Sequence, residues 1–371
     1  MSKLTKLIRD PNLFFYDYFA KRMLQNMNSN GNSKNPQIYA FHISDWKRNL
    51  FVDFFGKGKF VKFVPFKNIP KKLIDEIKLH PERDLFIWGM NLPEELNSCH
   101  NKKYFIEDGF IRSVGLGAEH TLPFSLTVDT KSLYLDSRVE TDLELMIKNF
   151  NPEKEKNIVL RARQNIEEII KLGISKYNNC KPIDISTIYG QKTKKRILVI
   201  GQVEDDASII YGSKKKFNNN DLVFTARLEN PDAEIYYKPH PDVLAGKRKE
   251  LSNPNEVKNI CKIITGSIPI SQMLQDVDHV YTITSQVGFE ALIRGIKVTT
   301  LGAPFYSGWG LTDDRQKITR RNVNRNIDEL FAVCYIKYPI YLNPYTKKRI
   351  EIEEAISNIT LLRDLEVIHN M

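Results

Sequence analysis

The second half of the chain contains Arg196-Ile197-Leu198-Val199-Ile200-Gly201-Gln202-Val203-Glu204-Asp205-Asp206-Ala207-Ser208, an apolar run followed at once by acidic residues. The apolar part, rich in β-branched side chains, predicts a buried strand. Three carboxylates directly after a buried strand are costly unless they meet solvent, a cation or a substrate. Because ligands of open α/β sheets bind at the carboxyl ends of the strands, this strand end is a candidate site.

Short apolar runs alternate with helical patterns on both sides of this stretch. Further strands are predicted at 38–41, 60–64, 85–89, 103–106, 234–237, 280–283 and 297–301. Helices are predicted at 47–55, 71–79, 152–173, 219–227, 268–277, 289–294 and 328–336. This alternation predicts an α/β protein with two doubly wound, Rossmann-like domains of mostly parallel strands.

The length of 371 residues is too great for one ordinary core and predicts two domains. We expect an N-terminal α/β domain at 36–190 and a C-terminal α/β domain at 191–345, with a patternless linker at 178–195 between them. A basic and aromatic segment at 1–35 precedes them, and a helical tail at 346–371 could pack back on the N-terminal domain.

The formal net charge of +10 indicates an anionic partner. The charge is spread along the chain without long basic tracts, so we do not expect nucleic acid to be that partner. The four cysteines stand far apart with no CxxC pair, which argues against a zinc site or a disulfide framework. No run is long enough to span a membrane and no signal peptide is evident, so we expect a cytoplasmic protein.

Polar motifs follow three other predicted strands. The first, residues 107–113, joins two acids, a glycine and Arg112, which could pair a substrate carboxylate or phosphate, or close a turn through a salt bridge. The second, residues 238–242, fixes His240 between prolines next to Lys238, an arrangement suited to a phosphate or to a turn. The third, residues 282–292, offers hydroxyls and free amides to an anion, or ordinary helix capping.

A fourth motif, residues 302–312, combines three glycines, a proline and three aromatic residues. Such a loop usually covers a ligand. The same kind of polar or glycine-rich loop at four strand ends is how an α/β enzyme builds its cleft. The pattern therefore favours an enzyme over a binding module.

Taken in order, these motifs resemble the KpsC-type capsule polysaccharide retaining β-Kdo (3-deoxy-D-manno-oct-2-ulosonic acid) glycosyltransferases. The resemblance covers roughly residues 80–345. It rests on EDGFIRS from Glu107, PFSL from Pro123, GQVEDDAS from Gly201, KPHPDV from Lys238, TSQVGFEAL from Thr284 and PFYSGWGLTD from Pro304. It implies a modified GT-B architecture, with the domain at 36–190 on the acceptor side and the domain at 191–345 binding the donor CMP-Kdo. It also implies no metal or other cofactor. KpsC itself carries two such modules, whereas this chain has one copy of each motif.

The resemblance also implies roles for single residues. Asp206 would be the nucleophile that forms a covalent Kdo–enzyme intermediate, and Glu107 the acid/base that deprotonates the acceptor. His240, with Lys238, would face the departing CMP phosphate. From charge, we expect Arg112 and Ser113 to suit the Kdo carboxylate. The other predicted donor-binding residues are Gln202, Ser208, Ser285, Gln286, Gly288, Glu290 and Pro304.

Expected partners are CMP-Kdo and either an anionic glycan or a phosphatidylglycerol-linked Kdo acceptor. The segment before residue 35 could touch the cytoplasmic face of the inner membrane or capsule assembly proteins. Two alternatives stay open at this point. One is an inverting or metal-dependent CMP-sugar transferase of GT-B type in which Glu204, Asp205 and Asp206 bind Mg²⁺. The other is a non-catalytic capsule assembly or export protein.

Overall fold

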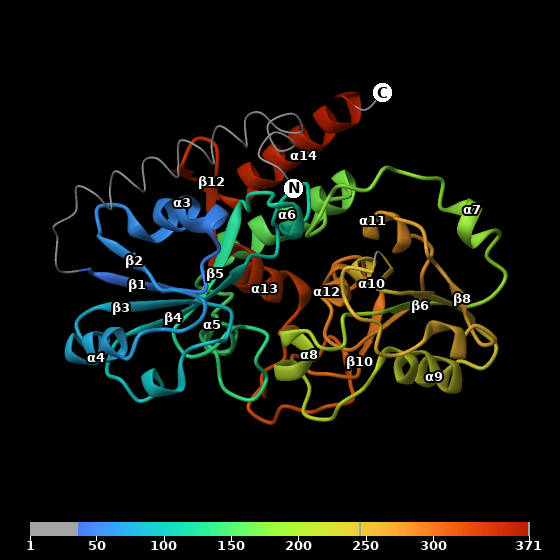
Figure 1. Ribbon diagram of the computed structural model, residues 1–371. Helices are drawn as coiled ribbons and strands as arrows, with labels where there is room; N and C mark the ends of the chain where they lie inside the picture. The colour runs from blue at the N-terminus through green and yellow to red at the C-terminus, as the bar shows by residue number, and fades with distance from the viewer. Residues whose placement is uncertain (1–35, 245, 370–371) are drawn as a thin grey trace. The chain divides into compact units, whose positions relative to one another are not determined.

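The computed structural model describes residues 36–244 and 246–369, and the chain divides into two compact units between Ile106 and Glu107 (Figure 1). Each unit is built around parallel strands. The division into domains at 36–190 and 191–345 stays a prediction, and the basic, aromatic segment at 1–35 lies outside the described residues.

The first unit contains a parallel sheet with the strand order β2-β1-β3-β4. Its strands are β1 (Ile38–Phe41), β2 (Val61–Phe63), β3 (Asp84–Trp88) and β4 (Lys103–Asp108). They are connected by η1 (Asp45–Lys47), α3 (Arg48–Phe51), η2 (Val52–Gly56), α4 (Lys71–Leu79) and η3 (Glu94–Leu96). Ile77 of α4 packs into one apolar cluster with Tyr39 and Leu85. The apolar residues of α4 recur at helical spacing, which predicts that one stripe of the helix is buried on the sheet.

The second unit holds a six-stranded parallel sheet in the order β11-β10-β9-β6-β7-β8. Its strands are β6 (Arg196–Ile200), β7 (Glu234–Lys238), β8 (Lys262–Ile263), β9 (His279–Thr282), β10 (Lys297–Thr300) and β11 (Asp313–Asp314). The strands β6 to β8 extend to one side and β9 to β11 to the other. The strand order therefore reverses between β6 and β9, which is the place where open α/β sheets bind ligands.

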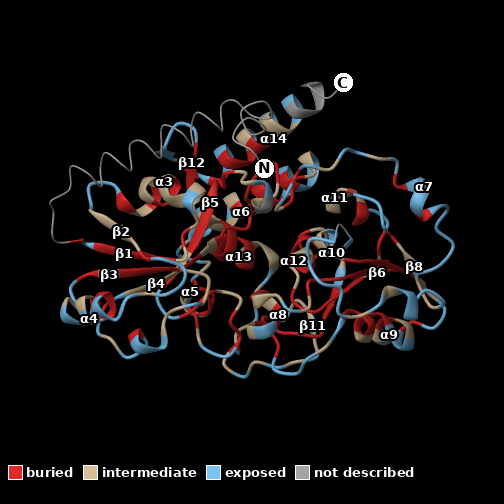
Figure 2. Cartoon of the chain, viewed as in Figure 1, coloured by how far each residue is buried: buried red, intermediate tan, exposed pale blue. Residues whose placement is uncertain are grey.

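Both faces of this sheet are covered, and its inner strands β6, β7, β9 and β10 are buried along most of their length (Figure 2). Ile197 and Val199 pack in one cluster with Leu222 of α9 (Asn219–Glu229), whereas Leu198 and Ile200 pack in another with Phe289 of α12 (Val287–Leu292). Alternate residues of a strand point to opposite faces, so the two helices lie on opposite sides of the sheet. A strand buried on both faces needs the continuous apolar run that the sequence shows.

The rest of the second unit is largely helical, with one antiparallel set of strands. The strands β5 (Ser125–Asp129), β12 (Ile340–Asn343) and β13 (Lys348–Arg349) pair antiparallel in that order. The longest helices of this part are α5 (Asp142–Asn149), α6 (Lys156–Leu172) and α14 (Ile352–His369). The shorter helical segments are η4 (Gly117–Glu119), α7 (Ser186–Tyr189), α8 (Ala207–Gly212), α10 (Pro241–Leu244), η5 (Pro254–Glu256), α11 (Ile270–Met273), α13 (Ile327–Phe331) and η6 (Ala332–Lys337).

The predicted α/β class with two parallel-rich sheets is confirmed, and most predicted strands and helices are present. Two local predictions differ. The helix expected at 268–277 is only the turn α11, because the chain leaves helical geometry and Asp276 takes a left-handed φ of 56°. The expected linker at 178–195 contains the short helix α7.

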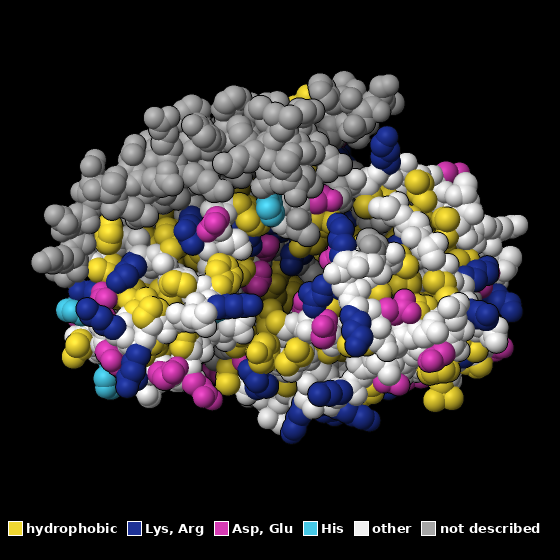
Figure 3. Space-filling view, in the orientation of Figure 1, with side chains coloured by type: hydrophobic (Ala, Val, Ile, Leu, Met, Phe, Trp, Pro, Cys, Tyr) yellow, Lys and Arg dark blue, Asp and Glu magenta, His cyan; other side chains and the backbone are white. Residues whose placement is uncertain are grey.

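The C-terminal tail forms α14, which packs on α6; Arg161 of α6 pairs with Glu351 and Glu353 at 2.8 and 2.9 Å. No helix among the described residues is long and apolar enough to cross a bilayer. On the face shown in Figure 3, Lys and Arg side chains lie scattered among acidic and hydrophobic ones, as the diffuse charge of the sequence predicts.

Candidate functional site

The carboxyl ends of β6 and β9 are joined by one buried side chain, Gln202. Its Oε1 accepts the Thr284 amide at 2.7 Å, and its Nε2 donates to the Thr284 hydroxyl at 3.0 Å. Gln202 is predicted to bind the donor, and the structure gives its amide a second task. It holds the loops after β6 and β9 together at the switch point of the sheet, so a ligand there would meet a fixed backbone.

The three acids after β6 point to different partners. Glu204 accepts the Ser252 hydroxyl at 2.5 Å and a backbone amide at the start of α9 at 2.6 Å. Asp205 pairs with Arg248 at 2.7 Å. Within the described part of the chain, no three His, Cys, Asp or Glu side chains lie close enough together to hold a metal ion. Glu204 and Asp205 are thus each engaged by side chains from the segment at 248–252.

Asp206 is the N-cap of α8. One oxygen, Oδ1, accepts both the Ser208 amide at 2.9 Å and the Ser208 hydroxyl at 2.8 Å. These bonds fix the carboxylate at the start of the helix. Ser208 is thus a residue that orients Asp206, in addition to the donor contact predicted for it.

His240, after β7, lies close enough to Asp206 for their charges to interact. Burial lowers the pKa of His240 below its ordinary value, with Asp242 and Asp206 opposing that shift. Its Nδ1 accepts the Asp242 amide at 3.1 Å, which assigns the proton of the neutral ring to Nε2. The ring is therefore held as a neutral hydrogen-bond donor beside a carboxylate. The neighbouring Lys238 is buried and its ammonium donates to the Gly266 carbonyl at 2.5 Å, while burial lowers its pKa.

At the end of β4, the two acids have different surroundings. Asp108 pairs with Arg112 at 2.7 Å, and the Arg112 side chain is completely buried. Arg112 also donates to the Ser113 hydroxyl at 2.5 Å. The salt bridge that the sequence offered as one reading of this motif is thus present. Glu107 is partly exposed, and one of its oxygens accepts the Asp108 amide at 2.9 Å. Predicted contacts of Arg112 and Ser113 with a sugar carboxylate stay predictions.

Sequence reasoning missed the segment from Ser175 to Asn178, which packs on the loop after β4. Asn178 donates from its amide to the Val114 carbonyl at 2.7 Å and from its side chain to the Ser113 carbonyl at 3.0 Å. The segment carries no motif, and Asn178 lies 65 residues from Ser113 in sequence, so only the fold brings it here.

Two ionisable side chains are important here: Glu290, which contacts this segment, and Lys176, which belongs to it. Burial raises the pKa of Glu290, whose Oε1 accepts the Ser175 hydroxyl at 2.8 Å. Burial would lower the pKa of Lys176, but nearby tyrosines and the acids Glu107 and Asp108 raise it above its ordinary value. A cation at Lys176 thus stands in the field of the predicted acid/base. Glu290, predicted to bind the donor, faces this segment.

The loop after β9 also contacts the loop after β4. Gln286 donates from Nε2 to the Phe110 carbonyl at 2.9 Å. Ser285 accepts the Tyr306 hydroxyl on its carbonyl at 2.6 Å. Gly288 lies beneath that tyrosine: a Cβ there would be 2.1 Å from the Tyr306 oxygen, so only glycine fits. Hydrogen bonds therefore connect the motifs at 107–113, 282–292 and 302–312, and the Gly201 amide donates to the Lys238 carbonyl at 2.8 Å to join the motifs after β6 and β7.

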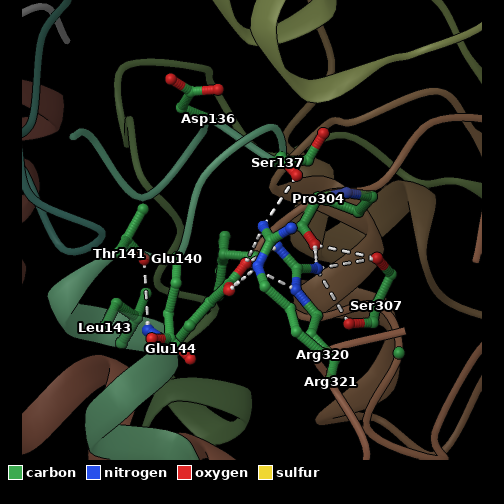
Figure 4. Close-up of polar contacts among 12 residues, drawn as sticks. Asp136, Ser137, Glu140, Thr141, Leu143, Glu144, Pro304, Ser307, Arg320 and Arg321 are labelled. Carbon is green, nitrogen blue, oxygen red and sulfur yellow. Dashed lines mark hydrogen bonds and ion pairs between the residues drawn. The ribbon is translucent and has the colours of Figure 1, made fainter. Parts of the chain in front are cut away.

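Pro304, in the aromatic and glycine-rich loop, is held by a buried ionic cluster (Figure 4). Arg321 donates to the Pro304 carbonyl at 2.5 Å and to the Ser307 carbonyl at 3.0 Å. Glu144 of α5 pairs with both Arg321 and Arg320. This cluster explains how a loop rich in glycine keeps one position.

A family model of capsule polysaccharide biosynthesis proteins matches residues 97–341. The chain belongs to the capsule polysaccharide biosynthesis family. It is 43% identical over 333 residues to the lipopolysaccharide-processing protein LpsZ of Rhizobium meliloti, covering 88% of this chain and 74% of LpsZ. It is 36% identical over 341 residues to the capsule polysaccharide modification protein LipA of Neisseria meningitidis serogroup B, covering 90% of this chain and 47% of LipA.

Two solved structures of Thermosulfurimonas dismutans KpsC resemble this capsule family member along most of its length. The beta Kdo 2,4 transferase matches with a TM-score of 0.73 and 29% identity, covering 89% of this chain and 100% of that one. The beta Kdo 2,7 transferase matches with a TM-score of 0.70 and 32% identity, covering 88% and 99%. These matches confirm the resemblance to KpsC that the ordered motifs predicted.

Proposed function

We propose that this protein is a retaining β-Kdo transferase that moves Kdo from CMP-Kdo to a glycan or glycolipid acceptor in capsule or related polysaccharide biosynthesis. The similarity to the KpsC transferases supports Kdo as the transferred sugar. The observation that supports this mechanism is the position of Asp206. Its carboxylate caps α8 at the switch point of the sheet, and it interacts electrostatically with the neutral His240.

In the first displacement, the Asp206 oxygen not held by Ser208 would attack the anomeric carbon of Kdo. The bond to the CMP phosphate breaks and its electron pair leaves with the phosphate. The Nε2–H of His240 would donate to that phosphate, since Nδ1 is occupied by the Asp242 amide. The result is a covalent Kdo ester of Asp206 with inverted configuration.

In the second displacement, an acceptor hydroxyl would attack the same carbon and the Asp206 carboxylate would leave. Glu107 would take the hydroxyl proton, which requires it to be ionised. The ammonium of Lys176 in its electrostatic reach favours that form. Two inversions retain the configuration of the sugar. The acceptor proposed is an anionic glycan or phosphatidylglycerol-linked Kdo, and the site of action the cytoplasmic side of the membrane.

CMP release and glycan product from CMP-Kdo and a β-Kdo-terminated acceptor would test this function. We expect both with wild-type protein in excess EDTA, and neither with Asp206→Ala. Asp205→Asn, which changes a neighbouring acid that pairs with Arg248, should retain most activity. Complete inhibition by EDTA would favour the metal-dependent alternative, and absence of turnover with every Kdo acceptor would favour a non-catalytic role.

A further inference from the structure

A pocket of about 690 Å³ lies at the amino ends of the strands of the six-stranded sheet, whereas the candidate site lies at their carboxyl ends. It is lined by Lys192, Thr193, Lys194, Lys195, Asp278 and Lys297. These residues precede or begin β6, β9 and β10, so they lie at the amino ends of three neighbouring strands. The five residues of β6 separate the amino ends of the strands from their carboxyl ends by about 16 Å.

The pocket carries a strong excess of positive charge. Four ammonium groups face one carboxylate, and that carboxylate is already occupied: Asp278 accepts Lys192 at 2.8 Å and the Arg196 amide at 2.8 Å. Lys195 donates to the Asn230 side chain at 2.7 Å. In the described part of the chain, no hydrogen-bond or ion-pair partner is found for the ammonium groups of Lys194 and Lys297, which are exposed.

The neighbouring His279 experiences this charge. Burial, followed by the charges of Lys195 and Lys297 and opposed by Asp313, lowers its pKa to about 4. Arg315 acts in the same direction. The positive potential of the pocket therefore extends from the surface to His279, the first residue of β9.

The lining excludes several classes of ligand. It contains no aromatic ring on which a nucleobase could stack and no apolar side chain to receive an acyl group. It contains no arginine, so a phosphate here would meet only separate ammonium charges and no bidentate partner. Separate ammonium point charges around a hollow fit several carboxylates spaced along one flexible chain.

We propose that this pocket is a secondary binding site for a carboxylated glycan chain. That the bound chain is the acceptor or product of transfer rests on the function proposed above, since each added Kdo brings one carboxylate. A chain held here is anchored away from the reacting end, which raises the local concentration of that end at the site.

The test is equilibrium binding of an oligogalacturonate, a linear glycan with one carboxylate per sugar, to the full chain at low salt. We expect binding that weakens with salt, and a loss of about tenfold or more in Lys194→Glu/Lys297→Glu. The matched control, Lys72→Glu/Lys78→Glu on α4, makes the same change in net charge and should bind nearly as wild type. A neutral maltodextrin of equal length should not bind.

Binding by the pocket variant equal to wild type, or an equal loss in the control, would overturn the proposal. So would a variant that loses binding to phosphatidylglycerol vesicles but keeps the glycan, because the site would then be a membrane contact. CMP release with a short acceptor should be the same in the pocket variant and wild type. That readout separates a failure of this site from a failure of the transferase function, since binding needs no turnover.

Discussion

Glu144 and Arg321 form an ion pair that is almost completely buried: Glu144 Oε1 lies 2.7 Å from Arg321 Nη2, and the side chains are 3% and 1% exposed. Arg320 joins the pair and donates to the Ser137 carbonyl at 2.7 Å, while Ser137 donates to the Tyr211 carbonyl at the end of α8. The cluster thus fastens both the loop after β10 and the helix that Asp206 caps.

Replacing Glu144 by Gln should lower the free energy of unfolding by about 3–5 kcal/mol, because two guanidinium groups, one of them fully buried, lose their carboxylate. Urea unfolding followed by circular dichroism measures this loss. Glu153→Gln removes an exposed partner of Lys156 and should leave stability unchanged within error. Equal stability of the two variants would show that the buried pair contributes nothing.

Stability should depend on pH through His279. Its pKa in the folded protein is lowered to about 4, below the ordinary value of about 6.5 that it has when unfolded. As the pH falls through this interval, His279 binds a proton in the unfolded chain but stays neutral in the folded protein. The free energy of unfolding should therefore fall by about 2–3 kcal/mol between pH 6.5 and 4, less than the full shift because the ring is partly exposed.

Unfolding of His279→Gln at several pH values checks this assignment. The variant should lose that share of the pH dependence, whereas His100→Gln, an exposed histidine, should keep the wild-type slope. A slope unchanged in His279→Gln would mean that another group is responsible.

Glu107→Gln should separate the two proposed displacements. Its loss removes the base for the acceptor hydroxyl, so we expect transfer to slow by about 10²–10⁴-fold. The first displacement needs no proton from the acceptor, so the covalent intermediate should accumulate. Single-turnover measurement of CMP release against product formation distinguishes the steps. Equal slowing of both would contradict the role given to Glu107.

Eight strands of the parallel sheets could be predicted because each is encoded locally. The run of residues 196–200 is apolar at every position but the first, and the structure buries it completely on both faces. The strands β5 and β12 escaped prediction because their identity lies in pairing: Tyr341 meets Ser125 across more than 200 residues. Each is a run of only four or five residues, and nothing in the run shows which distant strand it pairs with.

The same reason limits the prediction of the site. Asp206, His240 and Glu107 stand in motifs at strand ends, and such positions are visible in the sequence. The burial of Arg112 and the approach of Lys176 to the acids of β4 depend on how distant segments pack. Composition and spacing carry no signal for those contacts.

The covalent intermediate on Asp206 is the central claim, and mass spectrometry of Glu107→Gln quenched with acid after mixing with CMP-Kdo tests it most directly. The account predicts a mass increase of one Kdo residue, located by peptide mapping on Asp206, and its absence in Glu107→Gln/Asp206→Asn. Turnover with no adduct on the single variant, or an adduct that persists when Asp206 is replaced, would contradict it.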